Sequence, residues 1–95
     1  MAPDQPLLDA LRHPLRRRLL RRYVDAEGQL SPKELADLEN QPLSNVSYHV
    51  RVLRDKGALE FSETRPVRGS LQHFYRPAER VTKTPWVLAT LGMEG

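Results

Sequence analysis

Apolar residues recur at helical spacing in the N-terminal half of the chain, and they predict a series of short helices. Leu7, Leu8 and Leu11 form the first group. Pro14 should end that helix, because a proline ring cannot continue a helix interior, and it suits the first turn of the next helix. This second helix is predicted to run to a stop at Gly28, with one apolar stripe opposite five arginines. The stripe consists of Leu15, Leu19, Leu20, Tyr23 and Val24.

A third helix is predicted from a recognisable start signal. Ser31 and Glu34 have the spacing of a capping box, and Pro32 between them suits the first helical position. The helix is expected to end near Asn40, because Pro42 disfavours helical backbone at the residue before it. The residues that it is expected to bury are Leu35, Ala36 and Leu38.

A fourth helix is predicted over residues 44–56, only a tight turn after the third. Val46, Val50 and Leu53 recur at i, i+4 and i+7 and should therefore face inward. Gly57 follows at the position where a left-handed C-cap is favoured. The two helices thus have the spacing of a helix-turn-helix.

Beyond this point the period changes from 3.6 to 2, which predicts a β-hairpin. Leu59, Phe61 and Glu63 alternate, and residues 71–76 alternate again after a basic tip at residues 64–70. Residues 77–83 are expected to form a polar connector. A second cap-then-proline signal follows at Thr84 and Pro85, in front of the almost wholly apolar residues 86–91. A helix so short and apolar must bury itself on its own domain or on a partner chain.

Composition supports one small domain over residues 1–95. A chain of 95 residues with 39% hydrophobic and 28% charged residues is too apolar for a disordered protein and too polar for a membrane protein. Its small core makes association with a second copy a natural source of further burial. The absence of cysteine excludes disulfides, thiolate metal sites and a cysteine nucleophile. With no signal peptide and no long apolar run, a soluble cytoplasmic protein is expected.

The net charge of +3 comes entirely from the second half of the chain. Residues 1–42 carry seven basic and seven acidic groups, whereas residues 43–95 carry eight basic and five acidic groups. A basic half is typical of a protein with a polyanionic partner, although an ordinary solubilising surface has the same composition.

The predicted element order is that of an α+β winged helix-turn-helix domain, with a core over residues 7–77 and a terminal helix over 84–93. In this fold the second motif helix enters the DNA major groove and the hairpin, or wing, lies along the backbone. Small polar groups at the start of the fourth helix and arginines further along suit that role, and a solvated helix face is the alternative. Residues expected to reach base edges are Ser44, Asn45, Ser47, Tyr48 and Arg51, and those expected to hold phosphates are Arg54, Lys56, Arg65 and Arg68.

Four stretches also follow the patterns of a known family. Residues 13–20 (HPLRRRLL) are similar to D/H-P-x-R-x-x-I/L-L, residues 30–36 (LSPKELA) to L-S-x-x-E-L-A, and residues 46–53 (VSYHVRVL) to V-S-x-H-L-x-x-L. Residues 69–76 resemble a second wing strand that ends in Tyr-Arg. Over residues 7–77 the chain therefore resembles the ArsR-type winged-helix repressors and their relatives among bacterial and archaeal transcription regulators.

The resemblance implies a homodimer in which terminal helices of the two chains pack together. Each recognition helix would then occupy one half-site of a near-palindromic operator. Metal-sensing members carry cysteines in the helix that here includes residues 34–38, or His and carboxylate ligands in the final helix, and this sequence has neither set. No metal and no other cofactor are therefore expected. The expected dimer interface consists of Leu7, Leu8, Leu11, Trp86, Val87, Leu88 and Leu91.

The histidines do not indicate a metal site or an active site. His13, His49 and His73 are scattered without ligand spacing. His49 lies beside the buried stripe of the fourth helix, so we expect a hydrogen-bonded packing residue, with base reading as the alternative. No role is assigned to His73. A serine and histidine on one helix without an orienting acid do not make a catalytic site, so no enzyme is expected.

The arginines of the second helix leave two interpretations open. Arg16 and Arg17 would lie in the first helical turn, where the helix macrodipole disfavours a cation by ~0.3–1 kcal/mol. An acid on a neighbouring helix, such as Asp9 or Glu39, would offset that cost. A DNA phosphate is the other possible partner.

Two classes of function remain compatible with the sequence. The first is a homodimeric, cytoplasmic and nucleoid-associated transcription regulator that binds double-stranded DNA through residues 44–56 and the wing at 58–76. A small-molecule effector at the dimer interface is compatible with this function, but the sequence names no ligand. The second is a winged-helix module that binds another protein and no nucleic acid.

Overall fold

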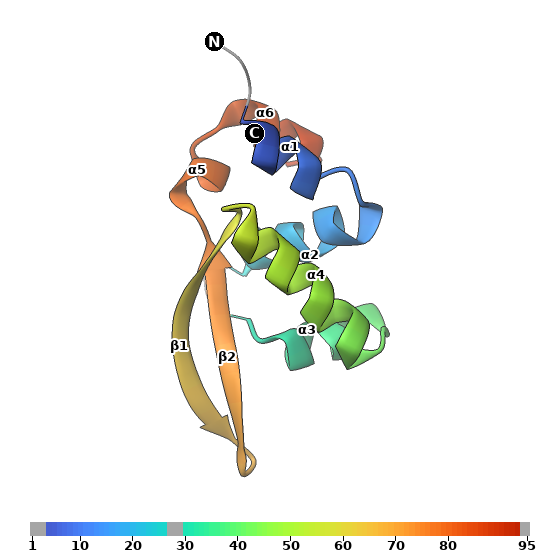
Figure 1. Ribbon diagram of the computed structural model, residues 1–95, viewed down its shortest axis with the longest axis vertical. Coiled ribbons are helices and arrows are strands. Elements are labelled where there is room, and N and C mark those ends of the chain that lie inside the picture. Colours follow the sequence, from blue (N-terminus) through green and yellow to red (C-terminus); the bar gives the residue numbers. More distant parts are fainter. Residues whose placement is uncertain (1–3, 27–29, 94–95) are drawn as a thin grey trace.

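The computed structural model describes residues 4–26 and 30–93, and it confirms a mixed α+β architecture (Figure 1). Helices α1 and α6 lie at one end of a molecule with extents of 47 × 24 × 22 Å, and the β-hairpin extends along one side to the other end. The stop expected at Gly28 lies outside the described residues. The elements are α1 (Gln5–Ala10), α2 (Pro14–Asp25), α3 (Pro32–Glu39), α4 (Leu43–Asp55), β1 (Leu59–Val67), β2 (Ser70–Pro77), α5 (Glu79–Thr82) and α6 (Pro85–Thr90).

The apolar stripes of α2 and α4 enter the core, as predicted, and residues of the other helices and of both strands complete it. Leu19, Leu20 and Tyr23 on α2 are fully buried, and so are Val46 and Leu53 on α4. Burial of each such side chain stabilises the fold by about 1.5–3 kcal/mol, which is enough to hold two short helices in a fixed relation. The position of α4, the helix with most of the predicted DNA-contacting residues, is therefore set by the core.

Helix α3 has the predicted start and end, but one buried residue was predicted wrongly. The capping box of Ser31 and Glu34 is present, and Asn40 ends the helix in a left-handed conformation with φ of 53°. Leu38 is 53% exposed, although it was expected inside. Leu35 and Ala36 are buried, so the inward direction lies between them, and at 100° per residue Leu38 points about 110° away from it. Helical spacing from Leu35 alone was a misleading guide.

The wing is longer and its turn is tighter than the sequence pattern suggested. Strands β1 and β2 are antiparallel and remain paired as far as Val67 and Ser70, so most of the predicted tip at residues 64–70 is strand. Only Arg68 and Gly69 form the turn, with φ of 52° and 83°, as in the two-residue turns that match strand twist. A register shift between Phe61 and Glu63 interrupts the alternation expected there.

The segment predicted as a polar connector contains a helix. Residues 79–82 form α5, and Val81 on it is fully buried. Arg80 on the same helix forms a 2.7 Å ion pair with Asp4, which caps α1. A single buried valine and one long-range ion pair hold this turn of helix, and neither produces a periodic sequence signal.

Four of the seven residues expected at a dimer interface are buried within the protomer. Leu7 and Val87 lie on α1 and α6, Leu11 and Leu91 are the C-caps of these helices, and all four belong to one core cluster with the rest of the domain. The other three, Leu8, Trp86 and Leu88, are only partly buried. Intrachain packing of α1 and α6 thus already covers the four residues, and only Leu8, Trp86 and Leu88 retain surface for a partner.

Candidate nucleic-acid interface

The exposed face of α4 carries the polar residues expected to read DNA. Helix α4 begins at Leu43, after its N-cap Pro42, whose carbonyl accepts from the N–H groups of Asn45 and Val46. No side chain in the described part of the chain caps it. Ser44 and Asn45 are exposed, and the amide of Asn45 reaches only Gln41, at 3.4 Å. Their hydrogen-bonding groups are not needed for the cap and remain available at the start of the helix.

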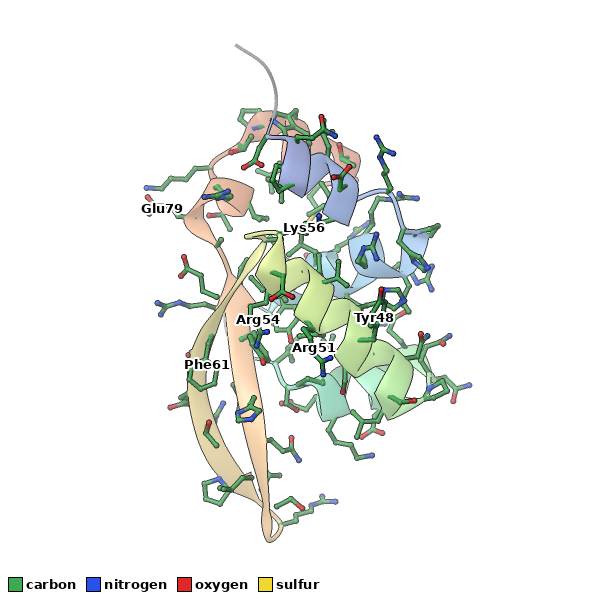
Figure 2. All side chains as sticks on the ribbon, viewed as in Figure 1. Tyr48, Arg51, Arg54, Lys56, Phe61 and Glu79 are labelled. Atoms are coloured by element: carbon green, nitrogen blue, oxygen red, sulfur yellow. The ribbon has the colours of Figure 1, made fainter. Side chains whose placement is uncertain are left out.

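Tyr48 and Arg51 continue this face along the helix. Tyr48 is 56% exposed. Arg51 is exposed and makes no hydrogen bond or ion pair with any residue in the described part of the chain. Figure 2 shows Arg51 and Arg54 on the side of α4 that faces the wing, with Tyr48 toward the other flank. Ser47 is half-buried and lines the space between α4 and the wing.

Two sets of hydrogen bonds fix the wing relative to the helix-turn-helix. The backbone of Tyr75 on β2 exchanges bonds with Leu30 at 3.1 and 3.3 Å. The hydroxyl of Ser31, the N-cap of α3, donates to the side-chain amide oxygen of Gln72 at 2.7 Å. The same hydroxyl accepts from Glu34 in the capping box, so the start of α3 and the middle of β2 share one polar anchor.

A cleft of about 350 Å³ separates α4 from β2. Its polar lining combines Arg51, Arg54 and Ser47 from α4 with Lys33 from α3 and His73 from β2. Its apolar lining includes Leu71 and Tyr75. The two elements that were predicted to touch DNA therefore border one concave, basic surface.

The four basic residues predicted to contact phosphates differ in their exposure and in their ion pairs. Arg54 forms a 3.1 Å ion pair with Asp55, which raises the pKa of Arg54 above its usual value, and both side chains are exposed. Lys56 lies at the C-cap of α4 and is half-buried. Arg68 is exposed at the turn of the wing. Two of these three cations therefore lie at the C-terminal end of α4 and the third at the turn of the wing.

Arg65 already has intramolecular partners. Its guanidinium lies 3.8 Å from the centre of the Phe74 ring and 2.6 Å from the carboxylate of Glu63. Cation–π contact and ion pairing both favour this position over a phosphate contact. Arg65 therefore covers Phe74, which is buried on the wing.

His49 is a buried, hydrogen-bonded packing residue, as expected. Only 6% of it is exposed, and its ring lies 4.3 Å from the ring of His13. Arg16 donates to Nδ1 of His49 at 3.4 Å. Burial, then the neighbouring His13 and Arg16, lowers the pKa of His49. The ring of Tyr48 packs edge-on against His49, so the cluster also supports a residue of the candidate DNA-reading face.

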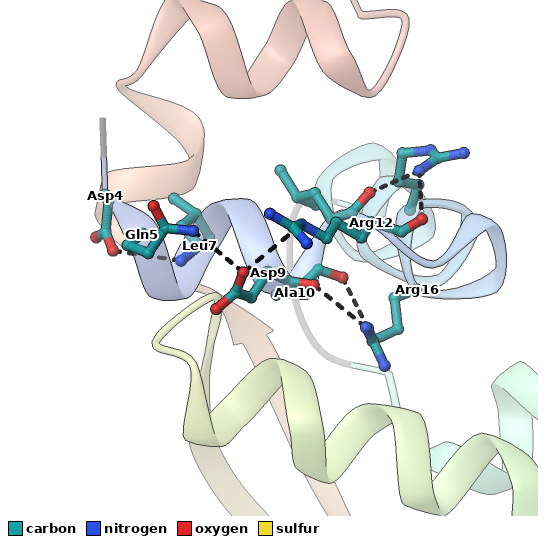
Figure 3. A network of polar contacts seen from close by, with 9 residues as sticks. Asp4, Gln5, Leu7, Asp9, Ala10, Arg12 and Arg16 are labelled. Carbon is teal, nitrogen blue, oxygen red and sulfur yellow. Dashed lines mark hydrogen bonds and ion pairs between the residues drawn. The ribbon is translucent and has the colours of Figure 1, made fainter. Parts of the chain in front are cut away.

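Arg16 and Arg17 bind the end of α1 rather than an acid. Arg16 donates to the carbonyl of Ala10 at 2.7 Å, and Arg17 donates to the carbonyl of Leu11 at 2.6 Å (Figure 3 shows the surrounding network). Carbonyls at a helix C-terminus lack intrahelical partners and carry partial negative charge. They offset the unfavourable position of these cations at the start of α2.

Two further arginines of α2 pair with Glu39, one of the two acids considered from the sequence. Arg18 contacts Glu39 at 3.0 Å, and Arg22 binds its second oxygen. Burial raises the pKa of Glu39, but the hydrogen bonds from Arg22 and Arg18 outweigh it and leave the pKa below its usual value. The ion-paired interpretation of the α2 arginines is therefore confirmed for these two residues.

Sequence reasoning missed two residues of this region. His73 lies in the cleft and Gln72 anchors the wing to Ser31. The alternation of β2 predicts that His73 shares a strand face with Leu71 and Tyr75. The strand alone does not predict which of its two faces lies toward α4. In the described residues no three His, Asp or Glu side chains gather as metal ligands, and no helix there is long and apolar enough to cross a membrane.

The fold and this interface define a winged helix-turn-helix protein. A model of the helix-turn-helix domain family matches residues 11–60, more than half of the chain, and the chain belongs to that family. Its motifs and its wing resemble those of the ArsR-type winged helix-turn-helix regulators, and an ArsR family transcriptional regulator is among the solved structures that share its fold.

Several solved structures share the fold. HlyU from Vibrio cholerae is 25% identical, with a TM-score of 0.64 over 93% of this chain and 83% of that chain. An ArsR family transcriptional regulator is 23% identical, with a TM-score of 0.61 over 84% of this chain and 77% of that one. NolR from Sinorhizobium fredii is 20% identical, with a TM-score of 0.60 over 100% of this chain and 97% of its own. No curated protein sequence matches this chain.

Proposed function

We propose that this protein is a homodimeric transcription regulator of the repressor type that reads an operator with α4 and holds the DNA backbone with the wing. The observation that carries the proposal is the unpaired, exposed Arg51 on a helix whose polar face borders the basic cleft beside the wing. Base edges would be read by Ser44, Asn45, Ser47, Tyr48 and Arg51, and phosphates would be held by Arg54, Lys56 and Arg68.

The wing contributes through its position as much as through its charge. Its bonds to Leu30 and Ser31 anchor β2 to the start of α3. An anchored element loses less conformational freedom when DNA binds than a free loop does, so its contacts add more fully to affinity. Arg65 has a smaller part in this proposal than the sequence suggested, because Phe74 and Glu63 already engage it.

The proposed dimer uses the end of the molecule that carries α1 and α6. Leu8, Trp86 and Leu88 are partly exposed there and would be covered by the same residues of a second copy. The buried residues Leu7, Leu11, Val87 and Leu91 would support this surface from beneath. A change of Leu88 to Glu places a charge on the proposed interface and should give a folded monomer in sedimentation equilibrium.

Binding to a random duplex across a salt series tests the proposal. With four to eight phosphates neutralised by one dimer, the slope of log K against log salt should be about −4 to −7. Arg21→Gln is the matched control, because Arg21 on α2 does not line the cleft and already pairs with Asp25. It should leave the slope unchanged. An affinity indifferent to salt, or no DNA binding at low salt, would favour the protein-interaction module instead.

A further inference from the structure

His73 is an exposed histidine inside the cleft between α4 and the wing, and the contacts proposed above do not use it. It lies on β2 and lines the cleft together with Arg51 and Arg54 across from it. A concave surface lined by an imidazole and two guanidinium groups presents several hydrogen-bond donors of the kind that bind an anion.

Two neighbours on β1 hold the ring of His73. Its Nδ1 is 3.0 Å from Oγ1 of Thr64, the residue paired with it across the hairpin. The ring of Phe61 packs edge-on against it, with 5.8 Å between ring centres. With Nδ1 engaged by Thr64, the other ring nitrogen, Nε2, has no hydrogen-bond partner among the described residues and is free to donate to a ligand.

The cleft has the chemistry of an anion site with apolar walls. Three permanent cations line it, namely Lys33 from α3 and Arg51 and Arg54 from α4. No carboxylate is among its described lining residues; the acids nearest to these cations, Asp37 and Asp55, pair with Lys33 and Arg54 from outside it. From β1 only the neutral Thr64 and Phe61 contact His73.

We propose that this cleft holds a sugar–phosphate segment of one DNA strand and that Nε2 of His73 donates to one of its phosphate oxygens. The inference rests on the proposed function and adds a residue to it. Leu71 and Tyr75 would contact deoxyribose, while Arg54 flanks the phosphate. When Thr64 donates to Nδ1, neutral His73 carries its proton on Nε2 and can donate a hydrogen bond. Protonated His73 adds a full charge, so DNA affinity rises as the pH falls.

The proposal is tested by measuring the salt slope of random-duplex binding at about pH 8 and at about pH 6, where imidazole side chains change charge. Each additional neutralised phosphate steepens the slope by about 0.9, and a dimer has two such sites, so the wild-type slope should steepen by up to about 1.8 at the lower pH. Affinity at moderate salt should rise by about 3- to 30-fold. Circular dichroism at both pH values establishes that the protein is folded.

His73→Gln is the informative variant, because its amide can donate in place of Nε2 but cannot be protonated. It should bind like the wild type at about pH 8 and show no steeper slope at about pH 6. His13→Gln, which removes an imidazole outside the cleft, is the matched control and should keep the wild-type pH response. A pH response that persists in His73→Gln overturns the role of His73 and leaves the proposed function intact. A wild-type protein with no salt-dependent binding at either pH overturns both.

Discussion

Replacing Arg68 by Asn should weaken DNA binding and stabilise the fold at the same time. Arg68 occupies the first position of the two-residue wing turn with φ of 52°, a conformation that costs an ordinary side chain about 1–2 kcal/mol. Asn tolerates this conformation and precedes glycine in the favoured version of such turns, and Gly69 is already in place. The exposed arginine is therefore kept at a strained position where its charge, rather than its backbone preference, is useful.

The expected size of both effects follows from the geometry. Relief of part of the turn strain should raise the free energy of unfolding by about 0.5–1 kcal/mol, or about 2–8 °C in Tm for a domain of this size. Loss of one phosphate contact per protomer should reduce the salt slope of a bound dimer by about 1.8. Since the charge is lost on every sequence, operator and random DNA should be affected alike.

Thermal melts and fluorescence anisotropy with a random duplex measure the two effects on one protein sample. Arg68→Lys is the control, because it keeps both the charge and the backbone strain; its stability and salt slope should match those of the wild type. An unchanged slope in Arg68→Asn would refute the phosphate contact. A lower Tm in that variant would refute the account of turn strain.

Three further predictions concern α2 and α4. Arg51→Ala should reduce the preference for operator over random DNA by ~1–3 kcal/mol, and equal losses on both in a competition assay would contradict base reading by Arg51. Because the pKa of His49 is lowered in the fold, the unfolded chain takes up its proton first. The free energy of unfolding should therefore keep its full value above about pH 6.5 and fall as the pH drops below it. In His49→Gln the urea midpoint should depend less on pH. The hydroxyl of Tyr23 is buried without a hydrogen-bond partner among the described residues. Tyr23→Phe should therefore raise the free energy of unfolding by about 1 kcal/mol and shift the urea midpoint upward. A lower midpoint would contradict this account of the Tyr23 hydroxyl.

The candidate site was only partly accessible from the sequence. The polar face of α4 was predictable because helical periodicity states which residues point away from Val46 and Leu53. The role of Arg65 was not, because its contact with Phe74 crosses between strands and depends on the register of the hairpin. The sequence assigned no role to His73, because its place in the cleft with Arg51 arises from the packing of the wing against the helices.

Local rules in the sequence were sufficient for the helix-turn-helix and for the presence of a wing. The capping box of Ser31 and Glu34 needs only neighbours in the chain, and so does the stop at Asn40. Helix α5 and the exposure of Leu38 depended on tertiary structure, because a single buried Val81 and the direction of the core are properties of the packed molecule. The basic cleft likewise depended on the tertiary structure. Its residues come from α3, α4 and β2, and only the burial of the core and the anchoring of the wing bring them together.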